Sequence, residues 1–268
     1  MSYIPDFFVV GAMKAGTSSL FRDFFVNDEI LRTKGKEVNF MLEDLSWQEL
    51  NDKYRTQYAS SGLIKCDVSP KYSQWHNYEG VPARVFRANP EAKIIYITRD
   101  PIDRIISHLH HNLLRHRFPE SKVNEEVLQD ENYVMCSRYL FQINKFTEHF
   151  PTDRILILML EEIKSDPEIF CKRLNNFLGL SSIRFTGKRF NVSEQRNKIM
   201  WHDPVHRLFR SKTFIRLYHN FWYFINLKVD KPKLSSEVVL KLKRELYDET
   251  HSFADAFGLD LKLWSNFK

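Results

Sequence analysis

A loop bracketed by two glycines near the N-terminus has the composition of a phosphate-binding turn. Glycines allow a tight turn whose backbone N–H groups point at an anion, and the dipole of the helix that we expect from about Thr17 adds to the attraction. The residues that we expect to contact the phosphate share backbone amides, hydroxyls or a positive charge: Lys14, Ala15, Gly16, Thr17, Ser18 and Ser19. A glycine turn without a ligand is the alternative interpretation.

The position of the lysine separates this loop from the usual nucleoside-triphosphate loop. A Walker A loop needs a lysine directly after its second glycine to reach the β and γ phosphates. Here Thr17 follows the second glycine, and the lysine lies inside the loop as Lys14. We therefore expect the loop to hold a phosphate group but to suit Mg-ATP poorly.

A second cluster follows in the segment YITRDPIDRIISHLHH. Arg99 stands at the end of an expected strand, and Ser107 lies on the helix that follows. Arg104 is three residues before Ser107 and therefore shares its helix face. A guanidinium and a hydroxyl on that face, with Arg99 on the strand side, predict a second phosphate pocket. The alternative is a local Arg99–Asp100 salt bridge beside an ordinary surface serine.

The elements that must position these clusters alternate along the chain. Apolar runs predict strands in DFFVVG, LIKCDVS, AKIIYITRD and RILILML, with helix-like stretches between and after them. Both clusters fall at the carboxyl ends of strands, where open parallel sheets bind ligands. We expect a P-loop-like α/β fold, with a central parallel sheet flanked by helices, as a single domain over residues 1–268. Two interpretations are open for the basic and aromatic stretch 184–230: a capping region over the active site, or a poorly packed excursion from the domain.

The net charge and the cysteines indicate the kind of binding partner and the cellular compartment. The formal charge of +6 at pH 7 favours an anionic partner, without choosing among nucleic acid, a sulfated polymer and a small polyanionic cofactor. The three cysteines have no metal-ligand spacing, and we expect them to be filler in a reduced, cytoplasmic protein. The chain leads from Met1 directly into the first expected strand, so we expect no signal peptide and no membrane anchor.

Together the two clusters resemble the cofactor-binding elements of sulfotransferases that use 3′-phosphoadenosine 5′-phosphosulfate (PAPS). In that family a glycine loop with its lysine holds the 5′-phosphosulfate, and an R-x7-S element holds the 3′-phosphate. The resemblance implies the first role for the loop from Lys14 to Ser19 and the second for Arg99 and Ser107, whose spacing matches. Further stretches resemble, in the same order, heparan-sulfate-type and related bacterial sulfotransferases: KGKEVNFM, DVSPKYS, SRYLFQINKFTEHFP, ILILMLEEIKSDPE, NNFLGL and FNVSEQR.

The resemblance also implies catalytic roles. Glu37, in KGKEVNF, matches the glutamate general base of the heparan-sulfate type, and Lys14 would stabilise charge on the bridging oxygen. Lys36 and Lys34 would hold the Glu37 carboxylate ionised. One alternative is that Lys36 and Glu37 form only a solvated charge pair. Another is a histidine base, as in hormone-type sulfotransferases, from three candidates: His108, His110 and His111.

Further residues near these motifs are candidates for contacts with the acceptor or the nucleotide. The acceptor candidates are Lys36, Asp67, Lys71, His108 and His111. Arg196 and Lys198 are expected to reach a phosphate of the nucleotide, with an exposed basic loop as the alternative. Heparan-type members often have a lysine just before the Ser/Thr-Pro pair, whereas this chain has Val68 there. That departure argues against a heparan-like acceptor.

These observations predict an enzyme that transfers a sulfuryl group from PAPS, with no metal required. The expected acceptor is a hydroxyl, less readily an amine, of a carbohydrate or small molecule, with in-line transfer and Glu37 as base. The alternatives are a P-loop nucleotide kinase or NTPase, a basic nucleic-acid-binding module, and a related fold that binds without catalysing. We expect no specific nucleic-acid partner, and the sequence leaves the oligomeric state open.

Overall fold

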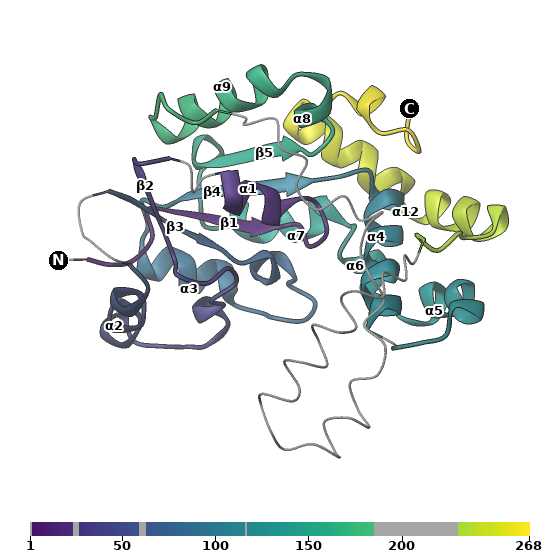
Figure 1. Cartoon of the computed structure of the whole chain (residues 1–268), viewed down its shortest axis with the longest axis horizontal. Helices are drawn as coiled ribbons and strands as arrows, with labels where there is room; N and C mark the ends of the chain where they lie inside the picture. Colours follow the sequence, from purple (N-terminus) through teal and green to yellow (C-terminus); the bar gives the residue numbers. More distant parts are fainter. Residues whose placement is uncertain (1, 24–26, 59–62, 116, 185–229) are drawn as a thin grey trace, which may run out of the picture.

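A five-stranded parallel sheet forms the centre of the protein (Figure 1). The structure is a computed structural model that describes residues 2–23, 27–58, 63–115, 117–184 and 230–268. The strands are β1 (Phe7–Gly11), β2 (Ile30–Arg32), β3 (Ile64–Val68), β4 (Lys93–Thr98) and β5 (Ile155–Met159). They lie side by side in the order β2-β3-β1-β4-β5, and every neighbouring pair is parallel. The predicted α/β fold class is therefore confirmed.

The inner strands are apolar because both faces of the sheet are covered. All five residues of β1 are buried, and so are the last five residues of β4. Continuous apolar runs of this kind are typical of parallel sheets with helices on both faces. The sequence predicted four of the strands and missed β2, whose three residues include the exposed Arg32 and form an edge.

Helices connect the strands and cover the sheet. Their bounds are α1 (Thr17–Asp23), α2 (Trp47–Gln57), α3 (Val81–Ala88), α4 (Pro101–Leu114), α5 (Val123–Gln129), α6 (Asn132–Met135), α7 (Tyr139–Thr147), α8 (Glu162–Ser165), α9 (Pro167–Leu178) and α12 (Ser236–Phe257). Short 3-10 turns occur as well, among them η3 (Pro70–Ser73) and η7 (Leu261–Leu263). Asp100 caps the start of α4 with its side chain, and Gly179 ends α9 with a positive φ of 74°.

The strand order gives the sheet a point at which the direction of the chain reverses. From the central β1 the chain first builds β2 and β3 on one side, and then β4 and β5 on the other. Figure 1 shows α1 on one face of the sheet, α3 and α7 on the other, and α4, α6 and α12 beyond the carboxyl end. In open α/β sheets, ligands bind at the carboxyl ends of strands beside such a reversal, here around β1.

One hydrophobic core joins the two ends of the described chain. It extends from Ile4 to Phe267 and includes apolar residues of all five strands and of α12. The thiols of Cys66 and Cys136 are buried within the fold. Within the described residues, no helix is long and apolar enough to cross a membrane. The capping region predicted for 184–230 lies, apart from its two end residues, outside the described residues.

Candidate active site

The glycine loop, residues 11–16, leaves β1 and packs against the ends of β4 and β5. The amide of Ala12 donates to the carbonyl of Ile97 at 2.6 Å. Gly16 has a φ of 97°, and a Cβ there would lie 2.5 Å from Cδ1 of Leu160, the residue after β5. The backbone conformation favours glycine here, and any larger residue would also have to displace the Leu160 side chain.

Three successive amides lie where the loop meets the start of α1. Among the described residues, no carbonyl accepts from the amides of Gly16, Thr17 and Ser18. Lys14, inside the loop, adopts a positive φ of 70°, which is uncommon for a residue with a side chain. Successive amides without an internal acceptor are the kind of group that an anion can satisfy.

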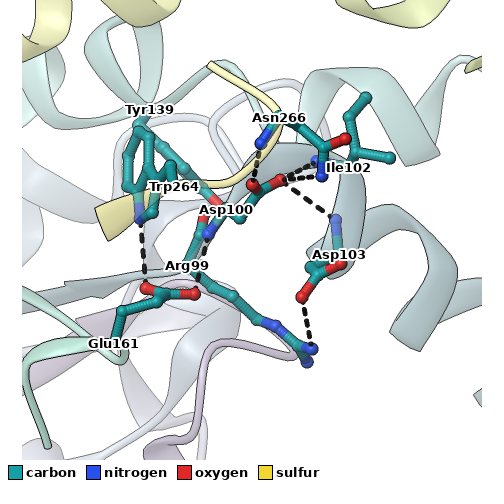
Figure 2. A network of polar contacts seen from close by, with 8 residues as sticks. All are labelled: Arg99, Asp100, Ile102, Asp103, Tyr139, Glu161, Trp264 and Asn266. Atoms are coloured by element: carbon teal, nitrogen blue, oxygen red, sulfur yellow. Dashed lines mark hydrogen bonds and ion pairs between the residues drawn. The ribbon is translucent and has the colours of Figure 1, made fainter. Parts of the chain in front are cut away.

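The second cluster lies on one face of α4. Nη2 of Arg99 is 3.2 Å from Oδ2 of Asp103, four residues later (Figure 2). Ser107 is four residues further along the same face, and no described residue is hydrogen-bonded to its hydroxyl. Arg99 therefore contacts α4 one helical turn before Ser107. The predicted alternative of an Arg99–Asp100 pair is wrong, because Asp100 accepts from the amides of Ile102 and Asp103 instead.

Arg104 does not belong to this face, which corrects the expectation that it supplies a guanidinium beside Ser107. Its side chain is fully buried, with Nε donating to the Ser137 hydroxyl at 2.6 Å and Nη2 donating to the Tyr133 carbonyl. A spacing of three residues from Ser107 allows the Arg104 side chain either to lie beside Ser107 or to pack into the protein interior, and the structure shows the second arrangement. The donors of Arg104 instead tie α4 to the segment around α6 and α7.

Glu37 is held at the carboxyl end of β3. Its amide donates to the Val68 carbonyl at 3.1 Å, and its backbone has a positive φ of 63°. The carboxylate side chain is 40% exposed and forms an ion pair with Lys36. The predicted charge pair is therefore present, and it lies at the same edge of the sheet as the glycine loop.

Asp67 sits below this segment as a buried acceptor. Its side chain is fully buried, and three hydroxyls donate to it: those of Tyr54 at 2.6 Å, Tyr72 at 2.7 Å and Ser69 at 2.6 Å. Burial raises the pKa of the carboxyl, an effect that the three hydrogen bonds oppose and that the nearby charge of Glu37 reinforces. This corrects the expectation that Asp67 contacts the acceptor, since no part of it is exposed.

The same hydroxyls hold the backbone that follows Glu37. The Ser69 hydroxyl accepts from the Asn39 amide at 3.3 Å, and the Tyr72 hydroxyl accepts from the Met41 amide at 3.2 Å. Asp67 thus holds the Glu37 segment through two intermediary hydroxyls. Sequence reasoning singled out Asp67 but gave it another role, because a buried and an exposed carboxylate look alike in a sequence.

His108 is buried against the ring of Tyr133, with centroids 4.6 Å apart. Burial, together with the positive charges of Arg104 and Lys14, lowers the pKa of its imidazole from 6.5 to about 2. His108 is therefore neutral near pH 7 and a poor acceptor of a proton. The influence of Lys14 also means that the glycine loop faces α4.

The remaining predicted residues are more widely distributed. His111 is half-buried on α4, one turn beyond Ser107. Lys71 is half-buried in η3, with Nζ 5.9 Å from the centre of the Tyr78 ring. Arg196 and Lys198 lie outside the described residues. In the described part of the chain, no group of three or more His, Cys, Asp or Glu side chains has the arrangement of a metal site.

The fold is that of open α/β proteins that bind ligands at the carboxyl ends of their strands, and the comparisons identify the family within that class. Residues 4–207 match the family model described as Sulfotransferase domain. Since the match covers more than half of the chain, the chain belongs to the family of PAPS-dependent sulfotransferases. The resemblance noted in the sequence is confirmed at the level of the family.

Individual relatives are more distant. Heparan sulfate glucosamine 3-O-sulfotransferase 3B1 from Mus musculus is 26% identical over 203 residues, which are 71% of this chain and 50% of the relative. Bifunctional heparan sulfate N-deacetylase/N-sulfotransferase 4 from Mus musculus is 24% identical over 67% of this chain and 23% of its own length. The chain thus spans about half the length of the first of these relatives and about a quarter of the length of the second.

A solved sulfotransferase from Alicyclobacillus acidocaldarius shares the fold. The two structures superpose with a TM-score of 0.67 over 97% of this chain and 98% of the other, at 20% sequence identity. The similarity therefore extends over the whole domain and concerns the backbone architecture.

Two tyrosines that both donate to Asp67 provide a test of how the Glu37 segment is held. We expect Tyr72→Phe and Tyr54→Phe each to cost about 1–2 kcal/mol of stability, because each removes one hydroxyl from a buried carboxylate. Only Tyr72→Phe also removes the acceptor of the Met41 amide. Amide hydrogen exchange at Met41 should therefore accelerate in Tyr72→Phe and not in Tyr54→Phe. Equal exchange in the two variants would contradict this arrangement.

The lowered pKa of His108 predicts a loss of stability in acid. The folded protein leaves the imidazole neutral, whereas the unfolded chain binds a proton near pH 6.5, so protonation favours unfolding by about 1.4 kcal/mol per pH unit below that value. Between pH 7.5 and pH 5, His108→Gln should therefore lose about 2 kcal/mol less stability than the unaltered protein. Urea unfolding at the two pH values measures this, and identical losses would mean that His108 titrates normally.

Proposed function

We propose that the protein transfers a sulfuryl group from PAPS to a hydroxyl group of a carbohydrate or small-molecule acceptor. The observation that carries the proposal is the convergence of three chemically distinct segments at the carboxyl edge of one sheet. These are the glycine loop after β1, the Arg99–Ser107 face after β4, and the Glu37 segment beside the end of β3. We further propose that residues 1–268 work as one sulfotransferase domain.

The residues present fit the nucleotide donor. The residues from Lys14 to Ser19 would hold the 5′-phosphosulfate, and the amides of Gly16, Thr17 and Ser18, which have no described backbone acceptor, support this role. Arg99 and Ser107 would hold the 3′-phosphate, and two observations support this role: Arg99 lies against Asp103, one helical turn before Ser107, and the Ser107 hydroxyl has no hydrogen-bond partner among the described residues. When bound, PAPS supplies the activated sulfuryl group. We propose that Arg196 and Lys198 add contacts to a phosphate.

Glu37 is proposed as the general base that takes the proton of the acceptor hydroxyl. Lys36, ion-paired with it, would keep the carboxylate ionised. Lys14 would stabilise the charge that develops on the bridging oxygen of the departing phosphate. In the described chain, three residues other than glycine have a positive φ: Lys14, Glu37 and Asn39. Strained backbone of this kind gathers at functional sites, and two of the three are the proposed catalytic residues.

The histidine alternative receives less support from the site. A general base works best with a pKa near the pH at which the enzyme operates. Burial lowers the pKa of His108 to about 2, which leaves it unable to take a proton at neutral pH. Lys36, Lys71 and His111 stay as proposed contacts to the acceptor, because each is at least partly accessible.

The acceptor is proposed at the level of its chemical class. The named activities of the relatives include O-sulfation and N-sulfation of heparan sulfate, and both involve a carbohydrate. This chain has Val68, fully buried, just before Ser69 and Pro70. It therefore lacks a lysine that heparan-type members often place there, and a smaller or less anionic acceptor suits the site better.

Calorimetric titration with 3′-phosphoadenosine 5′-phosphate (PAP), the product of the donor, tests the proposal without any acceptor. Binding in the absence of metal should be much tighter than binding of Mg-ATP. Arg99→Ala should weaken PAP binding about 100-fold, because a charge-assisted contact to a phosphate is lost. Preference for Mg-ATP would instead favour a P-loop kinase or NTPase. Salt-sensitive binding of unrelated oligonucleotides, without PAP binding, would favour a nucleic-acid module.

The role of Glu37 has a separate test. Glu37→Gln should lower kcat about 10²- to 10⁴-fold with any acceptor that the enzyme accepts, while PAP affinity stays the same. Glu43→Gln is the matched control, since Glu43 also forms a surface ion pair, with Lys53 at 2.6 Å, close by in the sequence. Equal rates in the two variants would exclude Glu37 as the base. Screening hydroxyl and amine acceptors in parallel decides between O- and N-sulfation.

A further inference from the structure

The turn that carries Arg99 is held at its backbone by two other elements. The Tyr139 hydroxyl, at the start of α7, donates to the Arg99 carbonyl at 2.7 Å (Figure 2). The next amide, that of Asp100, donates to Oε1 of Glu161, in the segment that follows β5, at 3.2 Å. The carbonyl and the N–H group of the Arg99–Asp100 peptide bond thus both have hydrogen-bond partners within the protein itself.

The C-terminal residues complete this arrangement. Asn266 donates to Asp100 twice, from its amide to Oδ2 at 2.9 Å and from Nδ2 to Oδ1 at 3.0 Å. The indole N–H of Trp264 donates to Oε2 of Glu161 at 3.1 Å. Figure 2 shows Trp264 and Asn266 converging on the turn from the opposite side to the Arg99 guanidinium.

These contacts are partly shielded from water. Trp264 is fully buried, and Asp100 is 2% exposed. The Trp264 ring packs against Tyr139, with centroids 5.8 Å apart, so the indole and phenol rings support each other. Hydrogen bonds in such surroundings define a geometry more strictly than fully exposed ones, because water competes less for the bonding groups.

We propose that residues 260–268 act as a C-terminal clamp, through Trp264 and Asn266, that positions Arg99 for binding of the 3′-phosphate. Tyr139 and Glu161 transmit this support to the backbone of the turn. The clamp lies beyond residue 207, where the match to the family model ends. The inference rests on the proposed function, because it assumes that Arg99 contacts a phosphate of the nucleotide.

The physical reason is that Arg99 lies between two rigid elements. Strand β4 ends at Thr98 and α4 begins at Pro101, so only Arg99 and Asp100 bridge them. A small rotation of this turn would move the guanidinium, at the end of a long side chain, relative to Ser107 on the helix. Binding groups must be held to within a fraction of an ångström by their supporting contacts.

Two pairs of variants test the clamp by calorimetric titration with PAP. Tyr139→Phe removes only the hydroxyl that donates to Arg99, and Asn266→Ala removes the side-chain bond to Asp100. The matched controls are Tyr58→Phe, whose hydroxyl donates to the Cys66 carbonyl at 3.0 Å, and Asn89→Ala, whose Nδ2 donates to the Pro5 carbonyl at 2.9 Å. Neither control residue contacts the Arg99 turn.

We expect PAP affinity to fall about 3- to 10-fold in Tyr139→Phe and Asn266→Ala, in keeping with the loss of one supporting hydrogen bond. The controls should stay within about 2-fold of the unaltered protein at a similar loss of thermal stability. In Arg99→Ala, adding Tyr139→Phe should cause no further loss, because the support then acts on a residue that no longer contacts phosphate. Asn266→Ala keeps the test available if Tyr139→Phe does not fold.

The outcomes separate the clamp from the proposed function. If the unaltered protein does not bind PAP, or if Arg99→Ala binds it equally well, the result contradicts both the proposed contact of Arg99 with phosphate and the proposed clamp. If Arg99→Ala loses affinity but Tyr139→Phe and Asn266→Ala behave like their controls, only the clamp is overturned. Additive losses in the double variant would likewise overturn it, since the support would then act elsewhere.

Discussion

A carboxylate that is removed from water must have its oxygens satisfied by hydrogen-bond donors, and this constraint organises the carboxyl edge of the sheet. Asp67 collects three hydroxyls beneath the Glu37 segment, and Asp100 collects backbone amides and Asn266 beneath Arg99. Neither carboxylate is exposed enough to reach a ligand. Each instead fixes a turn in which the neighbouring, more accessible residues carry the proposed chemistry.

The two turns use this constraint in different ways. Around Asp67, the donors come from α2, from η3 and from Ser69 between β3 and η3, so the Glu37 segment is held by elements close in the sequence. Around Asp100, the donors include Asn266, which lies 166 residues later in the chain. The geometry of the proposed 3′-phosphate site thus depends on complete folding of the domain, including α12 and the residues after it.

Strain and burial divide the site into parts with separate tasks. Lys14 and Glu37 have uncommon left-handed backbone conformations, which cost of order 1–3 kcal/mol each and persist only when the surrounding structure enforces them. His108 and Arg104, on the opposite side of α4 from solvent, are buried and serve the fold. The positive charges that remain near the edge, those of Lys14, Lys36 and Arg99, suit an anionic nucleotide, in keeping with the net charge of +6.

The sequence by itself determined the fold class, four of the five strands and the position of the two motifs that we propose bind phosphate. It did so because apolar runs and glycine turns are local signals, each readable within a few residues. Only the tertiary structure decided which polar side chains face solvent. Asp67 and Arg104 were expected to contact ligands, but both side chains are fully buried. The periodicity of a helix or strand groups residues on one face, but it does not predict which other segment packs on that face. The supporting roles of Tyr139, Glu161, Trp264 and Asn266 had no local signal, because hydrogen bonds between distant segments form only when the chain has folded around one core.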